Sequence, residues 1–423
     1  MKNKNPKIYG WSVVAASWLA VFCLFGYRAT FAILKGPMSA DLGWSQTEVT
    51  LGYSLMMVFY AVTAFFAGII LDKWGTKPVY FIAAIFGALG FWLTSMVHSH
   101  LTYLFTFGLI AGIATGMLWV TSTVSVRKWY VGKSYGTMWG IAFAGAPMAQ
   151  FILAFVTKGA LADQGPDAWR GAMVLLAVIM LVALILAVIL AKQSPEKYEM
   201  KAFGELPDNS ATATPSEYNW TTKEAFSIYP IWAAILTFLT AMMGEFLIWT
   251  QVVSFWTSDL GWERDVAINI YAIIGLVGIF SMPILGFVAD KVVQKTGHEA
   301  KGRKIMLIIG PLTGVIACIF LLLSSYAVFW AYVACVIFAI YWAIVPGGVV
   351  GYTGAVYGRK TLGKIWGLAT LIVMGIGPFM GSFIGGWLKD ISGSYTYSIY
   401  YALGSFIVAI FLAFSLPLVA KHK

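Results

Sequence analysis

Charged residues are scarce in this chain of 423 residues: 11% are charged, whereas 60% are hydrophobic. A soluble domain typically contains about 25% charged and about 45–50% apolar residues. This composition excludes an ordinary soluble globular domain, because the excess apolar surface must contact something other than water. We therefore expect much of the apolar surface to contact the lipid of a membrane.

Cysteine and histidine are also rare, with three and four copies. Cys23, Cys318 and Cys335 fall inside apolar stretches without paired spacing, which predicts buried apolar side chains instead of disulfides. The histidines lie in expected loops or tails, where they form neither a metal-ligand cluster nor a catalytic triad. No G-x-x-x-x-G-K-[ST] nucleotide motif occurs. We therefore expect no catalytic residue, no metal and no cofactor, and the chain is not predicted to be an enzyme.

Twelve apolar stretches are long enough to cross a membrane, which requires about 20 residues in a helix. They are too long and too uniformly apolar for the alternating strands of a membrane β-barrel. The first is also too long for the apolar part of a signal peptide. The stretches are Trp11–Ile33, Leu51–Leu71, Pro78–Val97, Leu101–Val126, Tyr135–Val156, Gly171–Ala191, Ile228–Trp256, Val266–Ala289, Ile305–Ser325, Val328–Val350, Ile365–Leu388 and Tyr397–Val419.

The loop charges predict the orientation of these helices. With both termini on one side, the loops of that side hold 22 of the 28 Lys and Arg residues, and the opposite loops hold 5. The positive-inside rule then makes the termini cytoplasmic, and we expect a multi-pass protein of the bacterial inner membrane. The net charge of +10 is spread over separate loops, so it reflects topology and does not indicate nucleic-acid binding.

The two halves of the sequence are related as a repeat. Residues 39–44 read SADLGW and residues 257–262 read TSDLGW, at an offset of 218 that also carries Gly68 onto Gly286 and Asp72 onto Asp290. Further landmarks follow in the same order, including Gly136 on Gly363. We predict two pseudo-symmetric six-helix bundles, residues 1–192 and 227–423, joined by a polar cytoplasmic linker at 193–226.

The loop GIILDKWGTKP at residues 68–78 resembles the major facilitator signature G-x-x-x-D-[RK]-x-G-x-[RK], and GFVADKVVQKTGHEAKGRK repeats it from Gly286. Residues 31–49 look like the region after the first helix in bacterial relatives of monocarboxylate transporters and oxalate–formate exchangers. Those relatives often carry an Arg in the eighth helix, which this chain lacks. Arg28 instead resembles the first-helix Arg of the anion–cation symporter branch, which favours an organic anion in general over a monocarboxylate in particular.

The resemblance implies the twelve-helix major facilitator fold, a cavity lined by helices 1, 4, 7 and 10, and a cytoplasmic gate. In that gate each signature Asp caps a neighbouring helix and pairs with a basic residue such as Arg127 or Arg359. The expected gate residues are Asp72, Lys73, Arg127, Asp290, Lys291 and Arg359.

Arg28 and Glu245 are the two ionisable residues well inside apolar stretches, where a charge costs about 2.5–3.5 kcal/mol. Three interpretations remain open. Arg28 binds an anionic substrate through its planar fork; or the two residues form a structural ion pair; or one or both reach the external surface. In the first two, Glu245 can also carry a proton. The predicted substrate-binding residues are Tyr27, Arg28, Trp119, Thr123, Glu245, Trp249 and Tyr341.

These features together predict secondary active transport of a small organic anion, such as a carboxylate, by alternating access. Proton symport and anion exchange both remain open, and we expect a monomer. The alternative is a proton-coupled exporter of lipophilic or cationic compounds, with Glu245 attracting the cation. A receptor-like sensor that keeps the fold without transporting is a third class.

Overall fold

The computed structural model describes residues 6–44, 46–161, 165, 167–204 and 218–420. Almost all of these residues are helical, which confirms the predicted all-α class. By contacts between its parts, the chain divides into two compact units. Unit 1 comprises residues 1–129, 141–202 and 363–371, and unit 2 comprises residues 130–140, 203–362 and 372–423.

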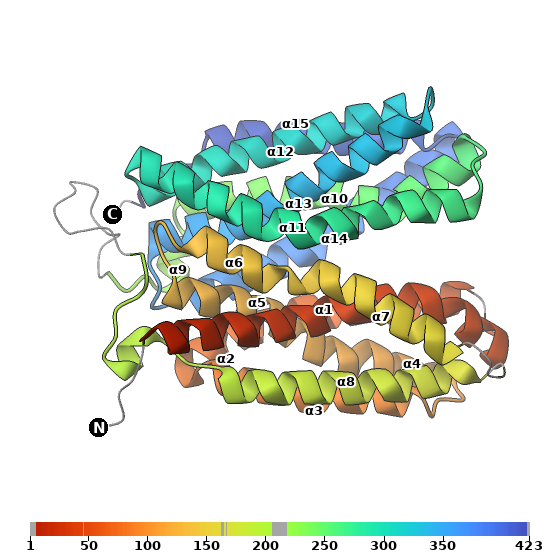
Figure 1. Ribbon diagram of the computed structural model, residues 1–423, viewed down its shortest axis with the longest axis horizontal. Helices are drawn as coiled ribbons and strands as arrows, with labels where there is room; N and C mark the ends of the chain where they lie inside the picture. Colours follow the sequence, from red (N-terminus) through yellow and green to blue (C-terminus); the bar gives the residue numbers. More distant parts are fainter. Residues whose placement is uncertain (1–5, 45, 162–164, 166, 205–217, 421–423) are drawn as a thin grey trace. The chain divides into compact units, whose positions relative to one another are not determined.

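Unit 1 consists of long helices that pack side by side. In Figure 1, α3 lies along α8, while α1 packs on α7 and α2 packs on α5. Its helices are α1 (Pro6–Leu42), α2 (Gln46–Trp74), α3 (Thr76–Thr94), α4 (His100–Tyr103), η1 (Leu104–Ile110), α5 (Ala111–Trp129), α7 (Gly145–Leu161), α8 (Ala168–Leu190) and the short η2 (Pro195–Tyr198).

Unit 2 is built in the same way. Its most extensive packing joins α12 to α13 and α15, α10 to α15, and α11 to α13. Its helices are α9 (Thr222–Phe226), α10 (Tyr229–Ser254), η3 (Phe255–Asp259), α11 (Arg264–Thr296), α12 (Glu299–Leu323), α13 (Val328–Tyr357) and α15 (Thr396–Phe414). Two helices contribute to both units, namely α6 (Tyr135–Phe143) and α14 (Leu362–Ser392).

In the described part of the chain, twelve helical segments are long and apolar enough to cross a membrane. Each overlaps one of the twelve predicted stretches, so this is a multi-pass membrane protein. Helices suit this medium because they satisfy their own backbone hydrogen bonds where lipid offers none. The division at 193–226 remains a prediction, since residues 205–217 of that linker lie outside the described residues.

Several helices extend beyond their predicted bounds, and two of the spans change their helical form. Helix α1 continues past Ile33 to Leu42 and includes Pro37, which removes one backbone hydrogen bond. The fourth and seventh spans contain the π-helical segments η1 and η3. A π-helical insertion changes the backbone ladder without changing hydrophobicity, so an apolar run gives no sign of it.

Close helix packing in unit 1 depends on small residues of α5. A Cβ atom at Gly116 would collide with the carbonyl oxygen of Tyr60 in α2, and one at Gly112 would lie 2.7 Å from the Cβ of Phe59. The G-x-x-x-G spacing places both glycines on one face, so the two backbones approach closely there.

We expect Gly116→Ala to lower the stability of the purified protein by about 1–3 kcal/mol, because the added methyl group overpacks this contact. Thermal unfolding in detergent measures the effect. The matched control is Gly404→Ala in α15, where an added Cβ has nothing within 4 Å. This control should be neutral or stabilising, and equal losses in both variants would contradict the packing account.

Candidate functional site

The Asp72 carboxylate of the first signature loop lies at the N-terminus of α14, within unit 1. It accepts hydrogen bonds from the backbone N–H groups of Lys364 (2.7 Å) and Gly363 (3.3 Å). The Nζ of Lys128, at the end of α5, lies 2.9 Å from the Asp72 Oδ1. The side chains of this pair are only 5% and 9% exposed, so the helix end and the ammonium together compensate a buried negative charge.

Asp290 makes the corresponding arrangement at the N-terminus of α6, within unit 2. It accepts hydrogen bonds from the backbone N–H groups of Gly136 and Thr137 and from the Thr137 hydroxyl, each at 2.7 Å. Its ion-pair partner is Arg303 at 3.0 Å, and these side chains are 2% and 1% exposed. Arg303 also donates to the Gly132 carbonyl at 2.8 Å and lies over the Tyr135 ring.

The two caps, formed by Asp72 on α14 and by Asp290 on α6, are related by the sequence repeat. Gly136 and Gly363 are equivalent in the two halves, and each is the second residue of a helix whose N-terminus is capped by the signature Asp of the other half. The helix-capping contact that the resemblance implied is therefore present twice. Its role as a gate remains a prediction.

Lys128 and Arg303 are ion-pair partners that the sequence did not single out. Arg127 is buried beside Lys128 and Arg359 is half-buried after α13. Arg303 had a sequence signal, because it follows Gly302 in the second copy of the signature; Lys128 had none beyond standing next to Arg127.

Lys73 and Lys291 are exposed, unlike the buried cap residues. Each lies over an aromatic ring of its own helix, Trp74 at 5.0 Å and Phe287 at 5.3 Å. The two lysines are thus placed alike in the two halves, each next in sequence to its signature Asp.

Glu245 is the buried carboxylate of the candidate site in unit 2, and its residue is 5% exposed. The Nε1 of Trp249, one turn further along α10, donates to its Oε1 at 3.4 Å. Tyr341 of α13 interacts with Glu245 through its side chain and also donates from its hydroxyl to the Ala241 carbonyl at 3.0 Å.

Aromatic side chains cluster around the Trp249 ring, which contacts this carboxylate. The Trp249 ring lies 5.1–5.5 Å from those of Trp342, Phe338 and Tyr271, all at steep angles, and Tyr341 stacks on Phe338. The structure thus brings together three predicted site residues, Glu245, Trp249 and Tyr341. Sequence reasoning did not identify Tyr271 or Phe338, because aromatic residues are common in every helix of this chain.

The predicted site residues of unit 1 are also buried. Tyr27 donates to the Met57 sulfur at 3.7 Å, and Trp119 packs edge-on against Phe143 at 5.4 Å. The Thr123 hydroxyl donates to the Trp119 carbonyl at 2.9 Å, so it is used within its own helix. Arg28 belongs to α1, but its side chain lies outside the described part of the structure.

Among the described residues, no group of three or more His, Cys, Asp or Glu side chains is arranged to hold a metal ion. The three cysteines are buried and are not in disulfides.

A sequence profile of the Major Facilitator Superfamily matches residues 17–381. The match covers most of the chain, and the chain therefore belongs to the Major Facilitator Superfamily. Its members are membrane transporters that are not enzymes.

Two curated relatives are distant but informative. Monocarboxylate transporter 4 of Gallus gallus is 22% identical over 281 residues, which cover 66% of this chain and 57% of that protein. The chain thus matches a little over half the length of that relative. The hexuronate transporter of Bacillus subtilis (strain 168) is 24% identical over 380 residues, covering 84% of this chain and 86% of that protein.

The fold is also seen in solved structures. The proton:xylose symporter XylE superposes with a TM-score of 0.73 at 13% identity, covering 97% of this chain and 96% of that chain. At this level of identity the likeness establishes the fold alone.

We expect Asp290→Ala to destabilise the protein by about 3–5 kcal/mol, because it removes the nearer and more buried carboxylate partner of the Arg303 guanidinium. The loss should be visible as a lower unfolding temperature in detergent. Adding Arg303→Met to this variant should recover much of the loss. Glu299→Gln is the control, because Glu299 lies 3.7 Å from Arg303 and is 16% exposed, and it should have little effect. A double variant as unstable as Asp290→Ala would contradict the buried-pair account.

Proposed function

We propose that this protein is a secondary active transporter of small organic anions that contain a carboxylate. The observation that carries the proposal is the presence of one Arg and one Glu in the apolar helices α1 and α10. A charge in hydrocarbon costs about 2.5–3.5 kcal/mol, so such residues usually serve a substrate or a coupling ion. The two curated relatives are named as a monocarboxylate transporter and a hexuronate transporter, and both names describe carboxylate substrates.

In this proposal Arg28 binds the substrate carboxylate, because a guanidinium donates two parallel hydrogen bonds to it. Tyr27, Trp119, Thr123, Trp249 and Tyr341 form the remaining walls. Glu245 exchanges a proton during the cycle, by symport, or assists an exchange of anions. The buried position of Glu245 among aromatic rings supports a carboxylate that changes its protonation state.

The two caps would serve as the gate of this transporter. The carboxylates of Asp72 and Asp290 stabilise one conformation of alternating access, and their bonds to α14 and α6 break in the other. Lys73, Arg127, Lys291 and Arg359 are proposed to contribute positive charge to this gate.

A second function is favoured by one specific observation. The rings of Trp342, Phe338 and Tyr271 cluster around Trp249, which donates to the Glu245 carboxylate, and aromatic faces with a carboxylate suit an organic cation. A proton-coupled exporter of lipophilic or cationic compounds is therefore the alternative.

Ligand binding separates these functions, because a ligand that binds the folded state raises its unfolding temperature; a concentration of 100 times Kd adds about 2.7 kcal/mol. The purified protein should be stabilised by lactate, glucuronate or a similar carboxylate, and not by tetraphenylphosphonium. Stabilisation by the lipophilic cation alone would favour the exporter.

Arg28→Ala should abolish both carboxylate stabilisation and transport while the protein still inserts and folds, since removing a charge from an apolar helix eases insertion. Arg28→Lys should also be severely impaired, because an ammonium cannot reproduce the guanidinium fork. The control is Arg28→Ala combined with Glu245→Gln. Restored uptake in this double variant would favour a purely structural ion pair and would refute the proposal that Arg28 binds the substrate carboxylate.

We further propose a monomer in a bacterial inner membrane, with bundles at 1–192 and 227–423 and with both termini and the 193–226 linker in the cytoplasm. A cysteine at the exposed position Ser99 should react with an impermeant maleimide from outside intact cells, and a cysteine at exposed Lys201 should not. The native cysteines are buried and give a low background. The reverse labelling pattern would invert this topology.

A further inference from the structure

The duplicated D-L-G-W segment ends the helical segments that carry Arg28 and Glu245. Helix α1 ends at Leu42 and is followed by Gly43 with φ 66°, while Leu260 after η3 is followed by Gly261 with φ 70°. This left-handed conformation strongly favours glycine and terminates a helix. The segment therefore stops the helix at the same place in both repeats.

The Asp of the first copy joins three helices of unit 1. Its carboxylate accepts hydrogen bonds from the Trp169 Nε1 at 2.9 Å and from Arg170 at 3.1 Å, both in the first turn of α8. Arg170 in turn donates to the carbonyl oxygens of Ser95 and Val97, which follow α3. Asp41 thus fixes the end of α1 to the start of α8 and, through Arg170, to the end of α3.

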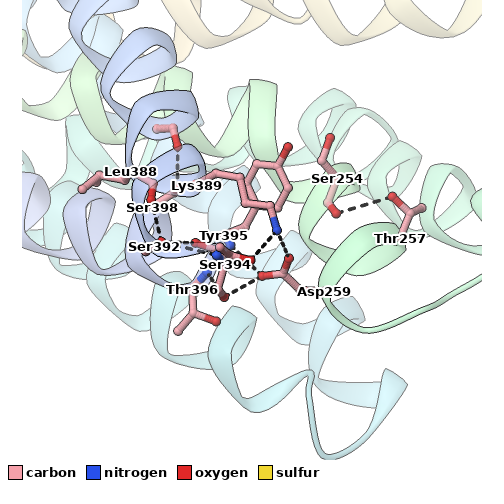
Figure 2. A network of polar contacts seen from close by, with 12 residues as sticks. Ser254, Thr257, Asp259, Leu388, Lys389, Ser392, Ser394, Tyr395, Thr396 and Ser398 are labelled. Atoms are coloured by element: carbon pink, nitrogen blue, oxygen red, sulfur yellow. Dashed lines mark hydrogen bonds and ion pairs between the residues drawn. The ribbon is translucent and has the colours of Figure 1, made fainter.

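The Asp of the second copy makes an equivalent junction in unit 2, shown in Figure 2. Asp259 accepts hydrogen bonds from the Lys389 Nζ (3.0 Å), the Ser394 hydroxyl (2.7 Å) and the Tyr395 backbone N–H (2.6 Å). Lys389 also donates to the Gly393 carbonyl at 2.7 Å. These residues form the connection between α14 and α15, so Asp259 fixes the end of η3 to that hairpin.

The Trp of each D-L-G-W copy, Trp44 or Trp262, packs against an aromatic ring of the same unit. The Trp44 ring lies 5.4 Å from that of Tyr103, while Trp262 stacks on Trp256 at 5.7 Å. The Asp259 junction also borders a cavity of about 510 Å³, so one side of it is not packed by other protein atoms. The contacts of the Asp and the Trp therefore help to fix the helix end.

Each junction lies a similar distance along the helix from the charged residue. Asp41 follows Arg28 by 13 residues and Asp259 follows Glu245 by 14, or about 20 Å at 1.5 Å per residue. Between the charged residue and the Asp, the regular backbone hydrogen bonds of the helix are interrupted, by Pro37 in α1 and by the π-helical η3 in unit 2. An interrupted helix bends more easily, so a fixed point at its far end is needed to keep its direction.

We propose that Asp41 and Asp259 are positioning residues for the transport site. Each ties the helix that carries Arg28 or Glu245 to a neighbouring helix connection of its own unit, and so sets the orientation of that charged residue. This inference rests on the proposed function for its consequence, whereas the junctions themselves do not depend on it.

Hydrogen exchange on the purified full-length protein tests the junctions without any ligand. Asp259→Ala should speed amide exchange about tenfold in the segments around Phe255–Asp259 and Lys389–Thr396, and leave unit 1 unchanged. Asp41→Ala should do the same around the end of α1 and the start of α8, and leave unit 2 unchanged. Ser398→Ala is the matched control, since its buried hydroxyl donates to the Gly385 carbonyl in the same hairpin. Unchanged exchange in both Asp variants, or equal effects of Ser398→Ala, would refute the junctions.

Uptake of radiolabelled lactate and glucuronate by proteoliposomes tests positioning. With equal amounts of folded protein, Asp41→Ala should raise KM about tenfold and change kcat about twofold or less, because it displaces Arg28, which binds the anion. Asp259→Ala should shift the pH dependence of uptake, because it displaces the proton carrier. Asp259→Asn, which keeps an acceptor for the Tyr395 N–H, should retain more of the wild-type profile.

The outcomes separate the two proposals. If Arg28→Ala transports normally, the proposed function fails. The hydrogen-exchange result still shows whether Asp41 and Asp259 hold the helix ends. If Arg28→Ala is inactive but both Asp variants keep wild-type KM and pH dependence, the positioning role is refuted.

Discussion

A carboxylate withdrawn from water requires hydrogen-bond donors and a positive charge, and this requirement organises both units. Asp72 and Asp290 meet it at the first turns of α14 and α6, with Lys128 and Arg303 as partners. Asp41 and Asp259 meet it at the ends of α1 and η3. In all four cases the carboxylate gathers backbone or side-chain donors from another helix, so each charge determines which helices meet.

The repeat explains why these arrangements come in pairs. A duplicated segment retains its backbone conformation, so the left-handed Gly43 and Gly261 recur together. The partners are less constrained, because any donor in reach can satisfy a carboxylate. Asp41 therefore uses an arginine and an indole, whereas Asp259 uses a lysine, a hydroxyl and a backbone N–H. What duplication preserves is the acidic residue and the helix end that it holds.

What the sequence could predict depends on whether a feature follows from a local pattern or from contacts between residues far apart in the chain. The twelve helices and the caps on Asp72 and Asp290 were predictable, because apolar runs and a signature loop are local patterns. The extension of α1 through Pro37 and the π-helical η3 were not, since Pro is disfavoured inside a helix and a π-helical segment has no hydrophobic signature of its own. Lys128 and Arg303 were missed as partners because ion pairing depends on three-dimensional proximity. The Trp249 ring and the rings that pack on it come from three different helices, α10, α11 and α13, and no local sequence pattern indicates that they meet.

Carboxylate transport coupled to protons or to a counter-anion is the central claim, and flux in proteoliposomes under an imposed gradient tests it most directly. Radiolabelled lactate or glucuronate should accumulate above equilibrium when the outside is acidified, or should enter only when the lumen is preloaded with the same anion. Either result supports the account and identifies the coupling mode. If neither anion enters under either condition, and a proton gradient instead drives extrusion of tetraphenylphosphonium, the account is contradicted.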